Sequence, residues 1–267
     1  MKIAFIGGGN MGEAILAAML GKKLSVAKDI TVSDVVETRR QYLAQKYAVA
    51  VSANNIETIN GKDIILLAIK PQTLPAVMTE LKGHLKPNQL VVSIIAGARI
   101  AKLGQGLEHK SIVRSMPNTP AQIGEGIAVW TATKDVTEQQ KKTAGIILGA
   151  MGKEFYVSDE GWLDMATAVS GSGPAYLFYF IEAMTDAAVK IGLPLDMAKE
   201  MVIGTVLGAV HLVKQSGKEP AELRRMVTSP GGTTAEAITT FEKDGFSELV
   251  YRAIKAAYEK SQKLGQG

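Results

Sequence analysis

The stretch Met1-Lys-Ile-Ala-Phe-Ile-Gly7-Gly8-Gly9-Asn10-Met11-Gly12 decides the fold of the N-terminal part of the chain. An apolar segment runs into three consecutive glycines, and the apolar residues of 14–19 then recur at helical spacing. A strand, a tight turn and a helix in this order are the context that a dinucleotide-binding G-x-G-x-x-G motif requires. Gly7 would make the turn, Gly9 would let the backbone approach a pyrophosphate, and Gly12 would let the helix lie close to the strand. A glycine turn without a ligand is the alternative.

The composition is that of an ordinary globular protein. The 267 residues are 46% apolar and 21% charged, which suits two domains. The net charge is +4, but the lysines are scattered, so no nucleic-acid partner is expected. The absence of cysteine excludes a disulfide framework and a thiolate metal site. No segment approaches the roughly 20 apolar residues of a membrane span. We therefore expect a cytoplasmic protein with no membrane contact.

Strand and helix patterns alternate through residues 1–161. Strand patterns follow the first one at residues 30–33, 49–51, 64–69, 90–95, 111–115, 127–130 and 154–157, and helical patterns lie at residues 74–81, 101–107 and 138–148. Alternation of this kind predicts an α/β fold, here a Rossmann-like doubly wound sheet that binds NAD(P).

Residues 162–267 have a different character, because strand patterns vanish. Helical patterns cover residues 175–190, 195–214, 219–226, 235–243 and 246–263, which predicts an all-α domain. Gly204, Gly208 and Ala209 recur at helical spacing and would let another helix approach closely. That helix could belong to a second subunit or to the same one, and we expect a homo-oligomer.

The end of the second predicted strand bears on the choice of cofactor. Asp34 follows Gly12 at close to the spacing of the acid that binds the adenosine ribose in this fold, which favours NADH. Ser33 with the nearby Arg39 and Arg40 could instead form a pocket for the 2′-phosphate of NADPH. The sequence leaves NADPH and NADH both open.

Two further loops follow predicted strands, where ligands gather in this fold. Pro71 cannot extend a central strand, so the chain must turn there and expose Ala68, Ile69 and Lys70. The alternative is a strand that simply stops, with Lys70 reaching into water. Asn118 lies between two prolines and would make a stiff polar loop tip suited to a nicotinamide ring, although a plain turn explains it nearly as well.

The helical region contains two glycine-rich segments before helices, residues 170–174 and 228–234. Thr233 and Glu236 have the spacing of a capping box, which would begin a helix there. Gly231 and Gly232 leave the amides of that helix start uncovered, which suits a carboxylate or phosphate. An ordinary capped helix after a proline turn is the alternative.

Acid–base and metal machinery is not evident in the sequence. His84, His109 and His211 have no ligand spacing, so no metal site is expected, and acids such as Asp63 and Asp164 have no paired-acid context. Hydride delivery to a protonated carbon–nitrogen double bond needs no proton transfer at carbon, whereas alcohol oxidation needs a base. The sequence therefore favours imine reduction.

Several motifs together resemble those of the pyrroline-5-carboxylate reductase family, and the resemblance covers essentially the whole chain. They are Ile6-Gly-Gly-Gly-Asn-Met11, Ala68-Ile-Lys-Pro71, Arg114-x-Met-Pro-Asn-Thr-Pro120, Ser170-Gly-Ser-Gly-Pro-Ala-Tyr176 and Val227-Thr-Ser-Pro-Gly-Gly-Thr-Thr234. The last motif is the most specific. The resemblance implies a Rossmann domain (1–161), a helical domain (162–267) interleaved between two subunits, and often a larger ring of dimers.

The resemblance also implies site residues. Those for the cofactor are Ile6, Gly7, Gly8, Gly9, Asn10, Met11, Asn55, Ala68, Ile69, Lys70 and Pro71, with Ala96 near the nicotinamide, in addition to Ser33 and Asp34. Those for the substrate, a small cyclic imine acid, are Ser229, Gly231, Gly232, Thr233 and Thr234. Thr234, which would hydrogen-bond the ring nitrogen, and Ser229 are the catalytic candidates. The implied reaction is the reduction of L-1-pyrroline-5-carboxylate to L-proline, the final step of proline biosynthesis.

Two alternatives stay open. A β-hydroxyacid dehydrogenase has the same two kinds of domain, but it carries a catalytic lysine one helical turn after a glycine motif like that of residues 171–173, where this chain has Leu177 and Phe178. A regulatory protein that senses dinucleotides would keep the first motif but would not need the amide loop at Gly231 and Gly232.

Overall fold

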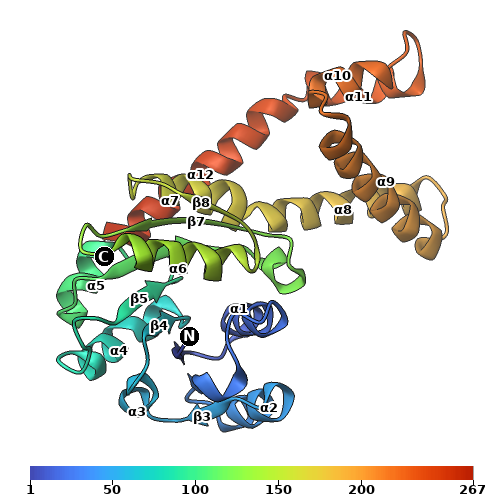
Figure 1. Cartoon of the computed structure of the whole chain (residues 1–267). Coiled ribbons are helices and arrows are strands. Elements are labelled where there is room, and N and C mark those ends of the chain that lie inside the picture. The colour runs from blue at the N-terminus through green and yellow to red at the C-terminus, as the bar shows by residue number, and fades with distance from the viewer. Residues whose placement is uncertain (267) are drawn as a thin grey trace. The chain divides into compact units, whose positions relative to one another are not determined.

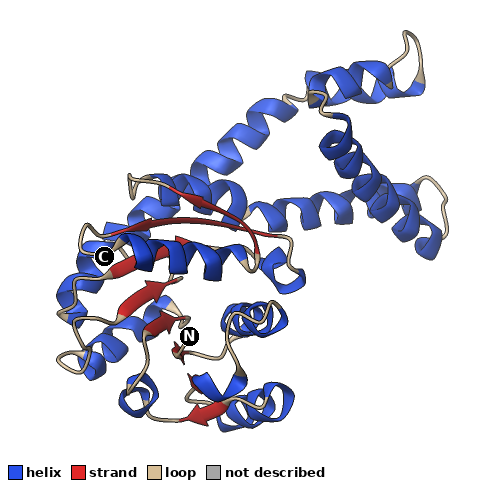
Figure 2. Cartoon of the chain, in the orientation of Figure 1, coloured by secondary structure: helices blue, strands red, loops and turns tan. Residues whose placement is uncertain are grey.

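The computed structural model describes residues 1–266 and contains, within them, an eight-stranded sheet. The strand order is β3-β2-β1-β4-β5-β6-β7-β8. The strands are β1 Ile3–Ile6, β2 Ile30–Ser33, β3 Ala50–Ser52, β4 Ile64–Leu67, β5 Leu90–Ser93, β6 Ile112–Met116, β7 Gly126–Ala132 and β8 Gly152–Tyr156. β6 and β7 run antiparallel, and the other neighbours run parallel. Helices cover both faces of the sheet (Figures 1 and 2), so the predicted doubly wound α/β fold is confirmed.

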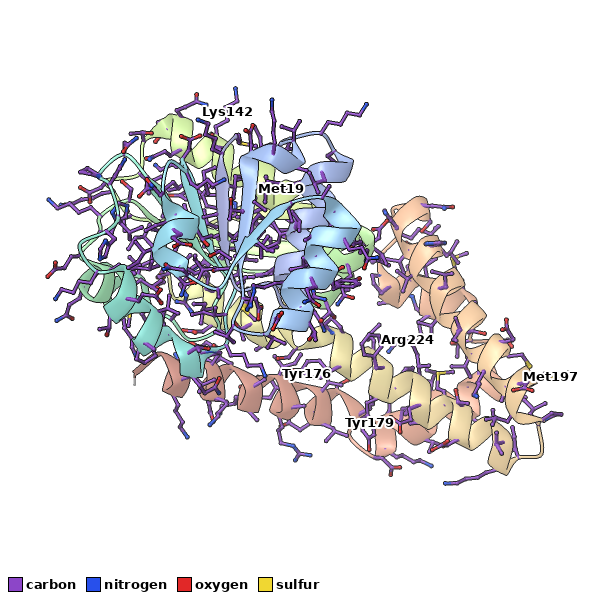
Figure 3. The ribbon with its side chains drawn as sticks, turned by 90° about the horizontal axis from the view of Figure 1, so that it is seen from below. Met19, Lys142, Tyr176, Tyr179, Met197 and Arg224 are labelled. Carbon is purple, nitrogen blue, oxygen red and sulfur yellow. The ribbon has the colours of Figure 1, made fainter. Side chains whose placement is uncertain are left out.

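Alternate strand residues feed two separate apolar cores. Ile3 and Phe5 of β1 pack on one face, with helices α1 Asn10–Gly21, α2 Glu37–Tyr47 and α6 Glu138–Gly149. Ala4 and Ile6 pack on the other face, with α3 Asn55–Ile59, α4 Leu74–Leu81 and α5 Ile100–Leu107. Met19 of α1 is fully buried in the first core (Figure 3). Because both faces of the strands are buried, their sequences are continuous apolar runs rather than alternating ones.

The chain divides into two compact units, and the first of them combines two separate stretches of sequence. The first holds residues 1–172 together with the chain from Ala257 onward, and the second is Gly173–Ala256. The short helix α7 Trp162–Ala166 and the π-helical turn Thr167–Gly171 that follows it belong to the first unit. The sequence instead places the domain boundary at residue 162, because strand patterns end after the last strand, β8. The sequence pattern does not show which helices pack against the sheet.

The second unit is entirely helical. It consists of α8 Gly173–Lys190, α9 Leu195–Ser216, α10 Pro220–Met226, α11 Thr233–Lys243 and the first part of α12 Phe246–Gln266. These bounds match the helical patterns of the sequence to within a few residues. Within this unit α8 packs against α9, while large apolar side chains such as Tyr179 and Met197 are mostly exposed (Figure 3).

Candidate functional site

A cleft of about 700 Å³ opens where the central strands of the sheet end. Its walls come from the segments that follow β1, β2 and β4, together with the starts of α1, α2 and α3. The residues that line it are Ile6, Gly7, Gly9, Asn10, Ser33, Asp34, Val35, Val36, Thr38, Arg39, Tyr42, Asn55, Ala68, Ile69, Lys70, Thr73 and Val77. β1 lies between β2 and β4, so the strand order reverses at β1, and this is the position at which doubly wound sheets bind ligands.

The glycine-rich turn is shaped by close backbone contacts. Gly7 has φ +97, and a Cβ there would lie 2.6 Å from the carbonyl oxygen of Ala68. A Cβ on Gly12 would lie 2.6 Å from the carbonyl oxygen of Gly7. Both positions therefore require glycine, which confirms the predicted tight turn and the close approach of helix to strand.

The N-terminus of α1 opens toward the cleft and fits a pyrophosphate. Gly9 is the N-cap residue, no side chain caps the helix, and Gly9 itself lines the cleft. A Cβ added to Gly9 would meet no atom within 4 Å, so it would project into open space. Uncovered amides at the positive end of a helix bind phosphate groups, and the bare backbone at Gly9 lets one approach.

Hydrogen-bond acceptors gather at the end of β2. The Asp34 carboxylate accepts the amide of Gly8 at one oxygen and the amide of Val36 at the other, each at 2.9 Å. Beside it the hydroxyl of buried Ser33 lies 2.5 Å from the side-chain oxygen of Asn55. The amide nitrogen of the Asn55 side chain donates to Glu80 at 2.7 Å, and the backbone amide of Asn55 also faces that carboxylate.

An ionic cluster centred on Glu13 forms the outer wall at α2. Its carboxylate accepts hydrogen bonds from Arg39, Tyr42, Lys46 and Tyr47, all of which lie on α2. Partial burial raises the pKa of Glu13, but the four hydrogen bonds outweigh it and lower the pKa from 4.5 to about 2. Arg39 also donates to the carbonyl oxygen of Gly8. Glu13 is therefore ionised at neutral pH, and it fixes the guanidinium of Arg39.

Most cofactor candidates named from the sequence lie together in the cleft, and four lie outside its lining. Those in the lining are Ile6, Gly7, Gly9, Asn10, Ser33, Asp34, Asn55, Ala68, Ile69 and Lys70. The amide of Gly8 is held by Asp34, and a Cβ on Gly8 would lie 2.5 Å from Leu43, so Gly8 faces the core. Met11 packs on the same core, Pro71 starts a turn of 3-10 helix (Pro71–Thr73), and Ala96 lies in the loop after β5. Their cofactor contacts remain predictions.

Asn118 is not the exposed loop tip that its flanking prolines suggested. It is buried, its side-chain nitrogen donates to the carbonyl oxygen of Ser170 at 3.0 Å, and its side-chain oxygen accepts the amide of Ile127 at 2.8 Å. Asn118 therefore ties the loop after β6 to the π-helical turn. Short π-helical turns such as Thr167–Gly171 are frequent at functional sites. The side-chain amide of Asn118 makes these two structural hydrogen bonds, and a contact with the nicotinamide ring stays a prediction.

Asp164 also has a context that its sequence spacing did not reveal. It is 1% exposed, it accepts Ser261 of α12 at 2.8 Å, and it forms an ion pair with Arg99. Arg114 of β6 lies nearby and pairs with Glu160 at 2.7 Å. The two acids and two arginines form a buried network within the first unit. Residues separated so widely along the chain give no local signal.

The substrate candidates lie in the second unit, in the loop between α10 and α11. α11 begins at Thr233 with Gly232 as its N-cap, and no side chain caps it. The predicted capping box is thus wrong, because Thr233 is the first helical residue and not the cap. Gly231 has φ +70, and the amide of Gly232 turns back to the carbonyl oxygen of Ser229 at 3.0 Å. The loop therefore presents an uncapped helix start flanked by the Ser229, Thr233 and Thr234 hydroxyls.

Several residues of the cleft were not found from the sequence. Glu13 and Glu80 act through other side chains, and their partners lie 25 to 34 positions away along the chain. Tyr42, Thr73 and Val77 line the cleft from helices whose sequences show no motif. In residues 1–266 no helix is long and apolar enough to cross a bilayer, and no group of three or more His, Cys, Asp or Glu side chains is placed to hold a metal ion.

Comparison with known proteins gives one consistent result. The family model described as pyrroline-5-carboxylate reductase dimerisation matches residues 160–264, and the one described as NADP oxidoreductase, coenzyme F420-dependent, matches residues 2–97. The chain is 41% identical to a pyrroline-5-carboxylate reductase of Synechocystis over 100% of this chain and 99% of the relative. Among solved structures it is similar to the pyrroline-5-carboxylate reductase of Coxiella burnetii (TM-score 0.90, 34% identity, 98% of each chain). It is also similar to the pyrroline carboxylate reductase of Plasmodium falciparum with NADP bound (TM-score 0.89, 33% identity, 99% of this chain and 98% of that one). The chain belongs to the pyrroline-5-carboxylate reductase family.

Proposed function

We propose that this protein reduces L-1-pyrroline-5-carboxylate to L-proline with NADH or NADPH, the final step of proline biosynthesis. Family membership over the full chain supports this reaction, and the cleft at the switch point of the sheet carries the proposal on the structural side. A bound nicotinamide would supply a hydride to the imine carbon. The chain itself then has to bind two ligands, orient them and keep the ring nitrogen protonated.

The first unit suits the cofactor. The uncapped start of α1 and the bare backbone at Gly9 would take the pyrophosphate, and Asp34 with Ser33 would face the adenosine ribose. Ala68, Ile69 and Lys70 line the same cleft from the end of β4. Pro71, the next residue of that loop, is proposed to line the cofactor as well, and Ala96 in the loop after β5 is proposed to lie near the nicotinamide.

The second unit suits the carboxylate of the substrate. Uncapped amides at the start of α11 attract an anion, and the left-handed Gly231 leaves them uncovered. In this proposal the amides of Gly231, Thr233 and Thr234 hold the ring carboxylate, since the amide of Gly232 already donates to Ser229. The Thr234 hydroxyl hydrogen-bonds the ring nitrogen, with Ser229 beside it. In this arrangement the Thr234 hydroxyl oxygen accepts from the ring N–H, which favours the iminium form, and the iminium accepts hydride more readily than the neutral imine.

We also propose that the protein works as a homodimer or a larger ring of dimers. Among the described residues of the second unit only Thr185, Ala198 and Val202 are buried, so this unit has almost no core of its own. Large apolar side chains on α8 and α9 are exposed instead. A second copy of the chain that covers them would provide the missing core. A cytoplasmic location remains a prediction from the composition.

The Thr234 role has a direct test. Replacing Thr234 with Ala removes one hydrogen bond to the reacting ring, so kcat with pyrroline-5-carboxylate should fall roughly 10- to 100-fold. The dissociation constant for NADPH or NADH, measured by nucleotide fluorescence, should not change. Thr240→Ala, on the same helix, is the matched control, since the Thr240 hydroxyl only donates to the carbonyl oxygen of Glu236. Equal kcat in the two variants would remove Thr234 from the mechanism.

The reaction itself is tested with purified protein and several substrates. Oxidation of NADH or NADPH should be followed with the five-membered imine acid and its six-membered homologue, and reduction of NAD⁺ or NADP⁺ with a 3-hydroxy acid. Turnover of the hydroxy acid without turnover of either imine would favour the hydroxyacid dehydrogenase alternative. Nucleotide binding without turnover of any of them would favour a dinucleotide sensor.

A further inference from the structure

We infer that the adenosine end of the cleft excludes a 2′-phosphate, so that this chain binds NAD(H) more tightly than NADP(H). The inference rests on the proposed function, because it concerns the dinucleotide in that same cleft. It concerns the three groups that the sequence offers as a phosphate pocket, namely Ser33, Arg39 and Arg40. In the structure each of them is already engaged, and the carboxylate of Asp34 lies among them.

The carboxylate of Asp34, directly after β2, carries a negative charge at the adenosine end of the cleft. Its two oxygens accept the amides of Gly8 and Val36, and its side chain lines the cleft. No Lys or Arg side chain pairs with that carboxylate among the ion pairs of the described residues. A carboxylate accepts a hydrogen bond from a ribose hydroxyl, whereas it repels the like charge of a phosphate.

Ser33 presents an acceptor to the cleft because its hydrogen is used elsewhere. The carboxylate of Glu80 can only accept, so the nitrogen of the Asn55 side chain must face it, at 2.7 Å. The side-chain oxygen of Asn55 then faces Ser33, and the Ser33 hydroxyl must donate to it at 2.5 Å. Glu80 thus acts as a positioning residue through Asn55. The Ser33 oxygen retains lone pairs for a hydroxyl but no hydrogen for a phosphate.

The two arginines are engaged as well. Arg39 donates to the carbonyl oxygen of Gly8 and pairs with Glu13, which also pairs with Lys46. Arg40 donates to the backbone oxygen of Asp34 at 2.7 Å. Lys70 lines the cleft after β4, and β1 separates β4 from β2, so Lys70 belongs to another part of the cleft. The Asp34 carboxylate and the Ser33 oxygen are therefore the acceptors that this end of the cleft offers, where a 2′-phosphate would need donors.

Direct binding measurements test the inference without any turnover. We would titrate the full-length protein with NAD⁺, NADP⁺, 5′-AMP and 2′,5′-ADP by isothermal calorimetry. We expect NAD⁺ to bind at least about tenfold more tightly than NADP⁺, and the two fragments to follow the same order. The difference should shrink at high salt, because it comes from charge repulsion at a solvent-accessible site.

Two variants connect the preference to these residues. Asp34→Asn removes the charge and keeps the shape, so the ratio of the NADP⁺ to the NAD⁺ dissociation constant should fall about tenfold or more. Glu37→Gln is the matched control: it makes the same change in charge three residues away, at an exposed position outside the cleft, and should leave the ratio unchanged. Glu80→Gln should lower the ratio less than Asp34→Asn does, because a side-chain amide in place of the Glu80 carboxylate no longer dictates the orientation of Asn55.

The possible results separate the inference from the function on which it rests. Equal or tighter binding of NADP⁺ by the unmodified protein would overturn the inference, while imine reduction with NADPH would still support the proposed function. An equal shift in Asp34→Asn and Glu37→Gln would also overturn it, because the preference would then follow the total charge. Failure to bind any of the four nucleotides would refute the proposed function itself.

Discussion

At the scale of single residues, the carboxylate of Glu13 holds four side chains in place. Its four partners Arg39, Tyr42, Lys46 and Tyr47 lie on α2, while Glu13 lies in the first turn of α1. The acid is well placed near the positive end of its own helix. It also joins the two helices that flank the adenosine end of the cleft.

The lowered pKa of Glu13 predicts a pH-dependent contribution to stability. The folded-state pKa of about 2 lies below the value of 4.5 expected for an unpaired Glu, so Glu13 stabilises the protein above pH 4.5 and this contribution is lost as the pH falls toward 2. Glu13→Gln should lower the free energy of unfolding by roughly 1–2 kcal/mol at neutral pH, a modest value because the site is partly solvated. Urea unfolding at a series of pH values should show this difference narrowing below pH 4.5. A difference that stays constant down to the acid limit would contradict the prediction, and Glu37→Gln is the control.

At the scale of secondary-structure elements, the sequence predicted what apolar periodicity can reveal. The strand at residues 30–33 and the helix at 74–81 have the predicted bounds, because each shows a clear apolar pattern. α2 was missed, since Leu43 is its only buried residue in the described structure and its other positions are mostly charged or polar. The reversal at β7 could have been inferred, because residues 117–125 are too few for a parallel crossover, which needs about a dozen or more.

The site was predictable in its backbone and not in its side-chain partners. Glycine motifs reflect the local backbone conformation, so the structural roles of Gly7 and Gly12 could be assigned from their spacing alone. The pairs Asn55 with Glu80 and Asp164 with Ser261 join positions 25 and 97 residues apart. Such pairings depend on how the helices pack, and one sequence carries no pattern for that. The hydrogen bonds of Ser33 and Arg39, on which the inferred cofactor preference depends, could not be predicted from the sequence for the same reason.

The end of α12 within the first unit depends on the buried network around Asp164. Asp164→Ala removes a buried carboxylate, leaves the partly exposed Arg99 without its ion-pair partner and removes the acceptor of Ser261, so we expect a loss of about 2–3 kcal/mol in the free energy of unfolding. Ser261→Ala removes one hydrogen bond and should cost about 1 kcal/mol. Chemical denaturation of both variants measures the effect. Asp159→Asn, exposed in the loop before α7, is the control and should change stability by less than about 1 kcal/mol. A similar loss in all three would mean that Asp164 has no special role.

At the scale of the whole molecule, the two units differ in how they are stabilised. The first buries two apolar cores on either side of its sheet, and its strands are covered on both faces. The second exposes apolar side chains along α8 and α9 and buries few residues among those described. A unit of this size with so little buried apolar surface cannot offset the conformational entropy of its own helices. In the proposed homo-oligomer a second copy of the chain would cover this apolar surface.

This arrangement predicts that assembly and stability are lost together. Leu207 lies on α9 and is 54% exposed, so Leu207→Arg would place a charge in the proposed subunit interface, where it would be desolvated without a partner. Light scattering should show the unmodified protein at a multiple of 28.4 kDa and the variant shifted toward the monomer. The variant should also have a lower melting temperature, which should rise with protein concentration. Ile123→Arg makes a comparable change at an exposed position of the first unit and should leave the mass unchanged. An unmodified protein that is monomeric and still cooperatively folded would contradict the prediction, since the second unit would then be stable without a partner.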